Sequence, residues 1–406
     1  MTDPSFSQQD RRALQSVAVQ FFVNGAAFAS FVPRLPEIRD RLALSLDQLG
    51  AVLTAGTAIG LLASMWSPKI IDAIGTRKSL IVFVVVLLTG LPLIGFANAW
   101  WMLLVGYAFV LSADGVVDIA MNLQGSWLSA RRHSPVMNRL HGLWSLGTVA
   151  GGLTAAQAAA SGVSLSVHLG FVAALLAAAL VFVGTGLLRT DEGGAETDVD
   201  HVVGPRTRAR WILLIVLAVS GGFALTVELV SSDWAAFRLS EDFSTSAGFA
   251  GLGFVAFTVG MTCGRLGGDA VVVRVGSDRL LRGAIVVSGI GLAVASFSPN
   301  RFGVLIGYVI AGVGISTFFP KLYDDAAQFP GQRGAALTWL RAGSGATALV
   351  IPVLVGTLAE SRLSVGTATA VVTLPCVVGF LAVSTRYGSG NGTGTARAGA
   401  SHQAGG

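Results

Sequence analysis

The chain has 406 residues, of which 53% are hydrophobic and 12% are charged, and its formal net charge is +5. Soluble domains average about 25% charged residues, so this composition excludes an ordinary soluble protein and indicates a chain that crosses a membrane many times. The basic residues are scattered between apolar stretches and form no single patch, which argues against a nucleic-acid partner. The two cysteines lie far apart within apolar stretches and predict neither a disulfide nor a zinc site.

Twelve apolar stretches are long enough to cross the ~30 Å hydrocarbon layer of a bilayer. They are expected at residues 14–33, 46–67, 79–97, 99–125, 141–161, 166–188, 211–232, 247–266, 283–298, 302–322, 334–359 and 363–384. With the N-terminus inside, 21 Lys and Arg side chains fall on the inner side and six on the outer side. Positive charge collects on the cytoplasmic side of membrane proteins. The sequence therefore predicts an all-α integral membrane protein with cytoplasmic N- and C-termini.

Polar segments divide the chain further. A linker at residues 189–210, rich in charged residues and glycine, separates an N-terminal six-helix half, residues 1–188, from a C-terminal half, residues 211–384. Residues 385–406 are rich in Gly, Ser and Ala and predict a disordered tail.

The two halves share an internal repeat. Gly75 and Gly276 are 201 residues apart, and each follows an apolar stretch and precedes basic residues. Gly106 and Gly307, each followed by tyrosine in the fourth and tenth stretches, have the same separation. A shared offset near half the chain length predicts two homologous six-helix halves in parallel orientation.

Two segments resemble the signature loops of the major facilitator superfamily of transporters. The first, PKIIDAIGTRKSL, matches at Asp72, Gly75, Arg77 and Lys78, although Pro68 replaces the usual first glycine. The second, GRLGGDAVVVRVGSDR, matches at Gly264, Arg265, Asp269, Arg274 and Gly276. The resemblance implies twelve transmembrane helices in two halves. It also implies that Asp72, Gly75, Arg77, Lys78, Arg265, Asp269 and Arg274 belong to gating loops between helices.

Four further segments resemble a bacterial branch of that superfamily, with fucose-permease-like sugar symporters and a rhizopine-associated membrane protein. They are FFVNGAAFASFVPRLPEIRDRL, DIAMNLQ, HGLWSLG and ELVSSDW. The resemblance implies a monomeric secondary transporter in the cytoplasmic membrane that moves a small polar solute, such as a sugar or polyol, by alternating access. A proton gradient would drive it and no cofactor is expected. The fourth stretch lacks the arginine of many proton-driven members, and the fifth lacks the proline of the antiporter signature.

Asp114, Asp118 and Asn122 recur every four residues in the fourth stretch and form one helical stripe. Acidic residues within a membrane normally face a protein interior, so the stripe should face inward. Asp114, about 20 Å from the outer end at ~1.5 Å per residue, is the leading proton-site candidate, with hydrogen bonding to a neighbouring helix as the alternative. Asp118 is a second proton candidate, or it could, with Asn122, hold the signature loop through Arg77 or Lys78.

Four residues from other stretches complete the candidate site. Asn24, near mid-membrane, suits a solute that carries hydroxyl groups, or an interhelical hydrogen bond. Trp144 is a candidate for stacking on a sugar face, or an interfacial anchor. Arg341 is expected to meet an anionic solute or an intramembrane carboxylate. Glu228 is expected in the outer third of its stretch, as a further proton site or an outer-gate partner.

Three other functions remain open at the level of sequence. An efflux antiporter for drugs or metabolites would favour a larger aromatic cavity than these small polar groups indicate. A membrane sensor derived from a transporter would not need the buried carboxylates. No HExxH, GxSxG or phosphate-binding loop is present, which argues against an enzyme and against a catalytic metal.

Overall fold

The computed structural model describes residues 7–132, 136–189, 208–327, 329 and 333–391, and within these ranges the regular structure is helical. In chain order the helices are α1 (Gln8–Ala29), the 3-10 helix η1 (Val32–Arg34), α2 (Leu35–Arg41), α3 (Leu46–Ser64), α4 (Ser67–Ile74), α5 (Thr76–Gly95), α6 (Trp100–Arg132), α7 (Met137–Ala160), α8 (Leu165–Gly186), α9 (Arg208–Asp233), α10 (Ala235–Phe243), α11 (Ala247–Val275), α12 (Ser277–Phe297), α13 (Arg301–Ile315), α14 (Phe318–Ala327), α15 (Arg333–Glu360) and α16 (Val365–Asn391).

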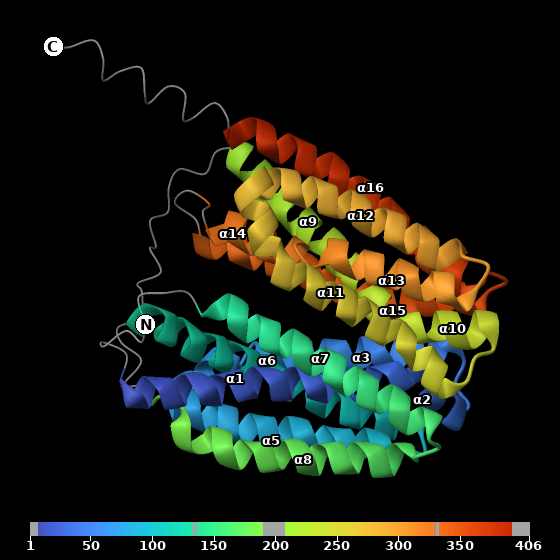
Figure 1. Ribbon diagram of the computed structural model, residues 1–406, viewed down its shortest axis with the longest axis horizontal. Helices are drawn as coiled ribbons and strands as arrows, with labels where there is room; N and C mark the ends of the chain where they lie inside the picture. The colour runs from blue at the N-terminus through green and yellow to red at the C-terminus, as the bar shows by residue number, and fades with distance from the viewer. Residues whose placement is uncertain (1–6, 133–135, 190–207, 328, 330–332, 392–406) are drawn as a thin grey trace.

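The long helices form two bundles side by side, α1–α8 and α9–α16 (Figure 1). Within the described residues, ten helices are long and apolar enough to cross a membrane, and α8 contains a shorter apolar stretch, Leu165–Val181. The remaining long helix, α7, has 24 residues and packs between α1 and α11, which brings the number of long helices in the described residues to twelve. The predicted all-α fold of two six-helix halves is confirmed.

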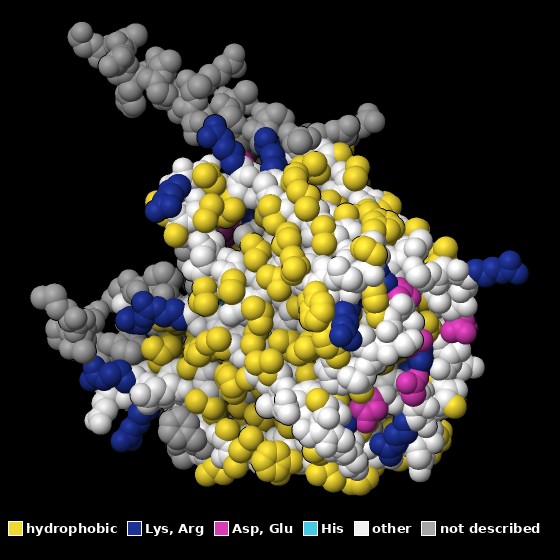
Figure 2. Space-filling view, turned by 45° about the vertical axis from the view of Figure 1, so that its right-hand side comes forward, with side chains coloured by type: hydrophobic (Ala, Val, Ile, Leu, Met, Phe, Trp, Pro, Cys, Tyr) yellow, Lys and Arg dark blue, Asp and Glu magenta, His cyan; other side chains and the backbone are white. Residues whose placement is uncertain are grey.

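The outer surface fits a lipid environment. Apolar side chains cover the middle of the face in Figure 2, whereas charged side chains gather toward its ends. Large apolar residues such as Val181 and Val273 are 77% and 87% exposed. An aqueous surface would penalise this much exposed apolar area, whereas hydrocarbon does not.

Several predicted boundaries are wrong by one or two turns. The ninth stretch, expected from residue 283, is the helix Ser277–Phe297, because its charged first turns are helical as well. The predicted disordered tail begins at residue 385, but α16 continues to Asn391. The helix α9 begins at Arg208, inside the predicted linker, and linker residues 190–207 lie outside the described residues.

The two signature segments, which the resemblance placed in loops between helices, are mostly helical. Asp72 lies in α4, and Arg77 and Lys78 lie in the first turn of α5. Arg265, Asp269 and Arg274 all belong to α11. Each segment turns at a single glycine, which separates consecutive helices.

Gly75 and Gly276 make these turns with the same backbone conformation. Their φ angles are +80° and +82°, a region that side chains with a Cβ rarely adopt. Each glycine ends one helix and begins the next, so both signature segments turn through one residue. The shared geometry supports the internal repeat.

A second repeated feature joins helices within each half. A Cβ added to Gly90 would lie 2.8 Å from the carbonyl oxygen of Gly106, and one added to Gly291 would lie 2.8 Å from that of Gly307. These glycines let α5 cross α6, and α12 cross α13, at backbone contact. Both pairs obey the 201-residue offset, so the repeat extends to the packing of the helices.

The two ends of the molecule differ. The start of α1 and the end of α16 lie at one end, hereafter the terminal end, and α2 and α10 lie at the other, the loop end (Figure 1). In this view the ribbons of the halves converge at the loop end and lie further apart at the terminal end.

Contacts between the halves close the loop end. Arg39 Nη2 of α2 lies 3.0 Å from Glu241 Oε1 of α10, and its guanidinium lies 5.9 Å from the ring centre of Phe237. The backbone N–H of Leu46, at the start of α3, donates to Glu360 Oε2 at the end of α15 over 2.8 Å. A carboxylate from one half therefore caps a helix of the other.

Two of the six arginines on the outer side, Arg34 and Arg39, have acidic partners close by in the sequence. Arg34 makes a two-pronged hydrogen bond to Glu37, both contacts at 2.7 Å, and Arg39 bonds Asp40. These acidic neighbours offset part of the positive charge on the outer side.

Candidate functional site

Asn24 of α1 is the centre of a hydrogen-bonded chain in the N-terminal half. Its Nδ2 donates to Asp114 Oδ1 of α6 over 2.7 Å, and its Oδ1 accepts from Trp144 Nε1 of α7 over 2.8 Å. The side chain of Asn24 is 4% exposed. Three residues expected at the site from the sequence are therefore in direct contact, although they lie 90 and 120 positions apart in the chain.

The orientation of the Asn24 amide follows from its partners. An indole N–H can only donate, so the group that faces Trp144 is the amide oxygen. The amide nitrogen must then face Asp114, whose carboxylate accepts. Asn24 uses Oδ1 of Asp114, which leaves Oδ2 for a proton or for a hydroxyl of a solute.

Glycines bring α1 and α7 close enough for this chain to form. A Cβ on Gly25 would lie 2.2 Å from the carbonyl oxygen of Trp144, and one on Gly147 would lie 2.2 Å from that of Phe22. No residue with a side chain fits at either position without moving the backbone. The close approach at Gly25 is visible in the sequence, and the structure identifies α7 as the neighbour.

Arg265 extends the site into the C-terminal half, which corrects its assignment to a gating loop. Its Nη1 donates to Ser145 Oγ over 2.8 Å, and its guanidinium lies 5.5 Å from the ring centre of Trp144. Arg265 also interacts electrostatically with Glu228 of α9. Sequence reasoning did not single out Ser145, whose position next to Trp144 was the available signal.

Asp118 and Asn122 continue the α6 stripe toward the terminal end. Asn122 Nδ2 donates to Asp118 Oδ1 over 2.9 Å and to the backbone oxygen of Asp118 over 2.8 Å. Asp118 also interacts electrostatically with Arg341 of α15, which is exposed although it lies within a membrane-spanning helix. Whether Arg341 pairs with an intramembrane carboxylate or meets an anionic solute remains a prediction.

The remaining gating candidates lie away from this cluster. Asp72 and Lys78 are exposed on α4 and α5, and Arg274 is exposed in the last turn of α11. Asp269 lies on the same helix, less than two turns before its end. Any role of these residues in gating remains a prediction.

Tyr107 and Asp233, from different halves, interact electrostatically on the loop-end side of Asp114. Tyr107 lies seven residues, or about two turns, before Asp114 on the same face of α6. It bonds Thr57 of α3 and interacts electrostatically with Asp233 of α9. Sequence reasoning missed Tyr107, although its spacing from Asp114 was visible.

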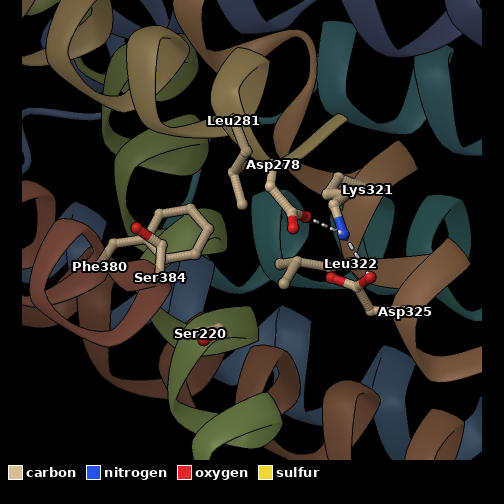
Figure 3. Close-up of a pocket in the computed structure, with 8 residues that line it drawn as sticks. All are labelled: Ser220, Asp278, Leu281, Lys321, Leu322, Asp325, Phe380 and Ser384. Carbon is tan, nitrogen blue, oxygen red and sulfur yellow. Dashed lines mark hydrogen bonds and ion pairs between the residues drawn. The ribbon is translucent and has the colours of Figure 1, made fainter. Parts of the chain in front are cut away.

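A second polar cluster lies in the C-terminal half, toward the terminal end. Lys321 of α14 contacts Asp278 of α12 at 2.9 Å and also bonds Asp325 (Figure 3). Ser220 and Phe380, from α9 and α16, line the other side of a small pocket beside this pair. The cluster joins neighbouring helices within one half and lies apart from the Asn24 chain.

A family model for the Major Facilitator Superfamily matches residues 17–232, which is more than half of the chain. The chain belongs to the major facilitator superfamily. Members of this superfamily with related sequences are named as transporters, so the protein is a multi-pass membrane transporter and not an enzyme.

Two relatives show how far the similarity extends. An uncharacterised superfamily transporter of Yersinia pestis is 28% identical over 336 residues, which cover 80% of this chain and 81% of that protein. The membrane protein MosC of Rhizobium meliloti is 24% identical over 86% of this chain and 84% of its own. The family recognised in the sequence is thereby confirmed.

Solved structures of the superfamily share the fold. The nucleoside transporter NupG has a TM-score of 0.70, with 14% identity over 94% of this chain and 99% of its own. A single-residue variant of the E. coli fucose:proton symporter FucP has a TM-score of 0.61, with 14% identity over 92% of this chain and 97% of its own. At this identity the likeness shows the major facilitator fold alone.

Proposed function

We propose that this superfamily member is a proton-coupled symporter of a small, hydroxyl-bearing solute such as a sugar or polyol. The observation that carries the proposal is the chain from Trp144 through Asn24 to Asp114. It places an indole, an amide and a carboxylate together on three helices of one half. Hydroxyl groups pair with amides and carboxylates, and sugar rings stack on indoles.

Asp114 is the proposed proton carrier. It is enclosed in a membrane-spanning helix, and its hydrogen-bond partner Asn24 is uncharged. A carboxylate in such surroundings is costly when ionised, so a proton or a bound solute group can change its free energy strongly. Asp118 and Glu228 differ because each has an arginine nearby, Arg341 and Arg265 respectively. The driving force is a proton gradient, and no cofactor takes part.

The arrangement of the halves supports an inward-facing state of an alternating-access cycle, with the termini on the cytoplasmic side. The loop end is held by Arg39 with Glu241 and by Glu360 with Leu46. In the outward-facing state these contacts would separate. The homologue names and the shared fold support transport by this rocking motion in a single chain.

Solute-driven proton movement tests the proposal. Purified protein is reconstituted in liposomes that contain a pH-sensitive dye, and L-fucose, D-glucose, myo-inositol and D-sorbitol are added in turn. We expect at least one of these solutes to acidify the lumen, and the same solute to lose its effect in Asn24→Leu. Asn300→Asp is the matched control, because aspartate replaces the Asn300 cap of α13 equally well.

Uptake of a radiolabelled solute that proceeds unchanged in the presence of a protonophore would contradict proton coupling. Movement of protons only when a solute leaves the liposome would instead favour efflux by antiport. Binding of a solute without any transport would favour a sensor.

A further inference from the structure

Arg265 occupies an unusual position for an arginine in a membrane-spanning helix. It lies on α11 of the C-terminal half, yet its hydrogen-bond partner and the ring beneath its guanidinium both belong to α7 of the N-terminal half. Its counter-ion Glu228 lies on α9 of its own half. One guanidinium therefore has partners in both halves.

These partners attract the guanidinium with different strengths. An ionised Glu228 attracts it by direct charge, whereas Ser145 offers one neutral hydrogen bond and Trp144 offers a ring face. The attraction between opposite charges out of water is stronger than that between a cation and a ring face. Protonation of Glu228 removes its attraction, so the charge of Glu228 determines how firmly Arg265 holds Trp144.

Hydrogen bonds lead on from Trp144 to Asp114. Trp144 Nε1 fixes the amide of Asn24, and that amide donates to Asp114 Oδ1. A change in the position of the indole alters the hydrogen bond that supports the ionised form of Asp114. Three side-chain contacts, Arg265 with Trp144, Trp144 with Asn24 and Asn24 with Asp114, therefore lead from one half into the other, and Glu228 interacts electrostatically with Arg265 at the start of this chain.

We infer that Arg265 is a positioning residue that couples the protonation of Glu228 in one half to that of Asp114 in the other. The inference rests on the proposed function, in which Asp114 carries the proton. It assigns Glu228 a role in coupling and removes Arg265 from the gating loop. Linkage requires the coupling to be reciprocal, so each carboxyl group changes the proton affinity of the other by the same factor.

Other titratable groups face this chain and must be kept unchanged in any test. Asp118 and Asp114 interact on α6, and Arg341 of α15 faces Asp118. His141, one turn before Ser145 on α7, interacts with Arg265 and packs edge-on against Phe21 at 5.2 Å. None of these groups is altered in the variants below.

The coupling is measurable without any solute. Infrared titration of purified protein follows the carboxyl C=O band, and the Asp114→Asn and Glu228→Gln variants assign the two groups by subtraction. We expect Glu228→Gln to move the titration midpoint of Asp114 toward lower pH, because Arg265 then holds Trp144 more firmly and strengthens the Asn24 hydrogen bond to ionised Asp114. The expected shift is about 0.7 on the pH scale, a fivefold change at the lower end of measured couplings.

The same measurement is then made in an Arg265→Gln background, where the shift should fall below about 0.2. Trp144→Phe keeps a ring under Arg265 but removes the N–H bonded to Asn24, and it should abolish the coupling as well. Arg279→Gln removes an exposed arginine from α12 of the same half and should leave the coupling intact. If Arg265→Gln fails to fold, Trp144→Phe still tests whether the coupling passes through this chain of contacts.

A midpoint for Asp114 that is the same with and without Glu228→Gln overturns the inference and leaves the proposed transport function intact. A shift that persists in both Arg265→Gln and Trp144→Phe also overturns it, since the two groups would then interact by another route. Absence of any titration at Asp114 would contradict the proton role in the proposed function, and with it this coupling.

Discussion

The two halves of this transporter repeat the same fold with different chemistry. Asn24 and Glu228 lie 204 residues apart on the first long helix of each half, and Arg34 and Arg238, on the segments that follow, have the same separation. Asn24, in the N-terminal half, is a neutral amide bonded to Asp114, whereas Glu228, in the C-terminal half, is a carboxylate that interacts electrostatically with Arg265. The repeat therefore preserves helix packing, while each half has its own polar groups.

The same contrast appears near the terminal end. Gln124 is fully buried and bonds Thr76 Oγ1 at 2.8 Å and the backbone of Leu188 at 2.7 and 3.0 Å. At the position 201 residues later stands Asp325, which pairs with Lys321. At this pair of positions a neutral hydrogen-bond network joins helices in the N-terminal half, whereas a lysine–aspartate cluster joins them in the C-terminal half.

The largest effect is expected when the neutral amide of Asn24 is replaced by a group that can carry a charge. Asn24→Asp replaces the donor that faces Asp114 Oδ1 at 2.7 Å with a second carboxylate, and two carboxylates that close cannot both ionise. We expect proton-coupled uptake at neutral pH to fall at least about tenfold, with partial recovery in acidic buffer where one proton is shared. Uptake rates across a pH series measure this. Unchanged uptake at every pH would show that the amide is not needed as a donor.

An intermediate effect is expected on stability, where the Gln124 network of the N-terminal half is compared with the Lys321 cluster of the C-terminal half. Gln124→Ala leaves buried backbone groups of Leu188 without partners and should cost about 2–3 kcal/mol. Asp278→Asn removes the partner of Lys321 that is 50% exposed and leaves the pair with Asp325, so solvent screens the loss and the cost should stay at about 1 kcal/mol. Thermal unfolding in one detergent compares the variants directly. An equal or reversed order would contradict the contrast between the halves.

The smallest effect is expected at the loop end. Arg39 and Glu241 connect the halves at 3.0 Å, but Glu241 is 29% exposed, and such pairs contribute about 0.2–1 kcal/mol. Arg39→Gln should therefore raise the outward-facing population no more than about fivefold, measured as spin-label distances across the loop end. Arg301→Gln, at an exposed α13 position in the same half as Glu241, is the control. A complete shift to the outward-facing state would show that this pair alone holds the end closed.

The sequence predicted the features that depend on periodicity and composition. The lengths of the apolar stretches predicted the helices, and the 201-residue offset predicted the repeat. The four-residue spacing from Asp114 predicted a stripe that faces inward. For Arg265 the sequence predicted only a place in a signature loop at the inner end of its stretch, whereas α11 continues as helix to Val275 and the side chain contacts Ser145 and Trp144 of the other half. Contacts such as that of Asn24 with Trp144 depend on how helices rotate against each other, which one helix's periodicity does not specify.

The most direct test of the account compares exchange with accumulation in Asp114→Asn, using a solute shown to move protons in the wild type. Asparagine keeps an acceptor oxygen for Asn24 but carries no exchangeable proton, so the site should bind solute and exchange it across the membrane. Asp324→Asn, an exposed change on α14, is the control. The account predicts normal exchange in Asp114→Asn with loss of accumulation against a gradient. Proton-driven accumulation that persists in this variant would contradict Asp114 as the proton carrier.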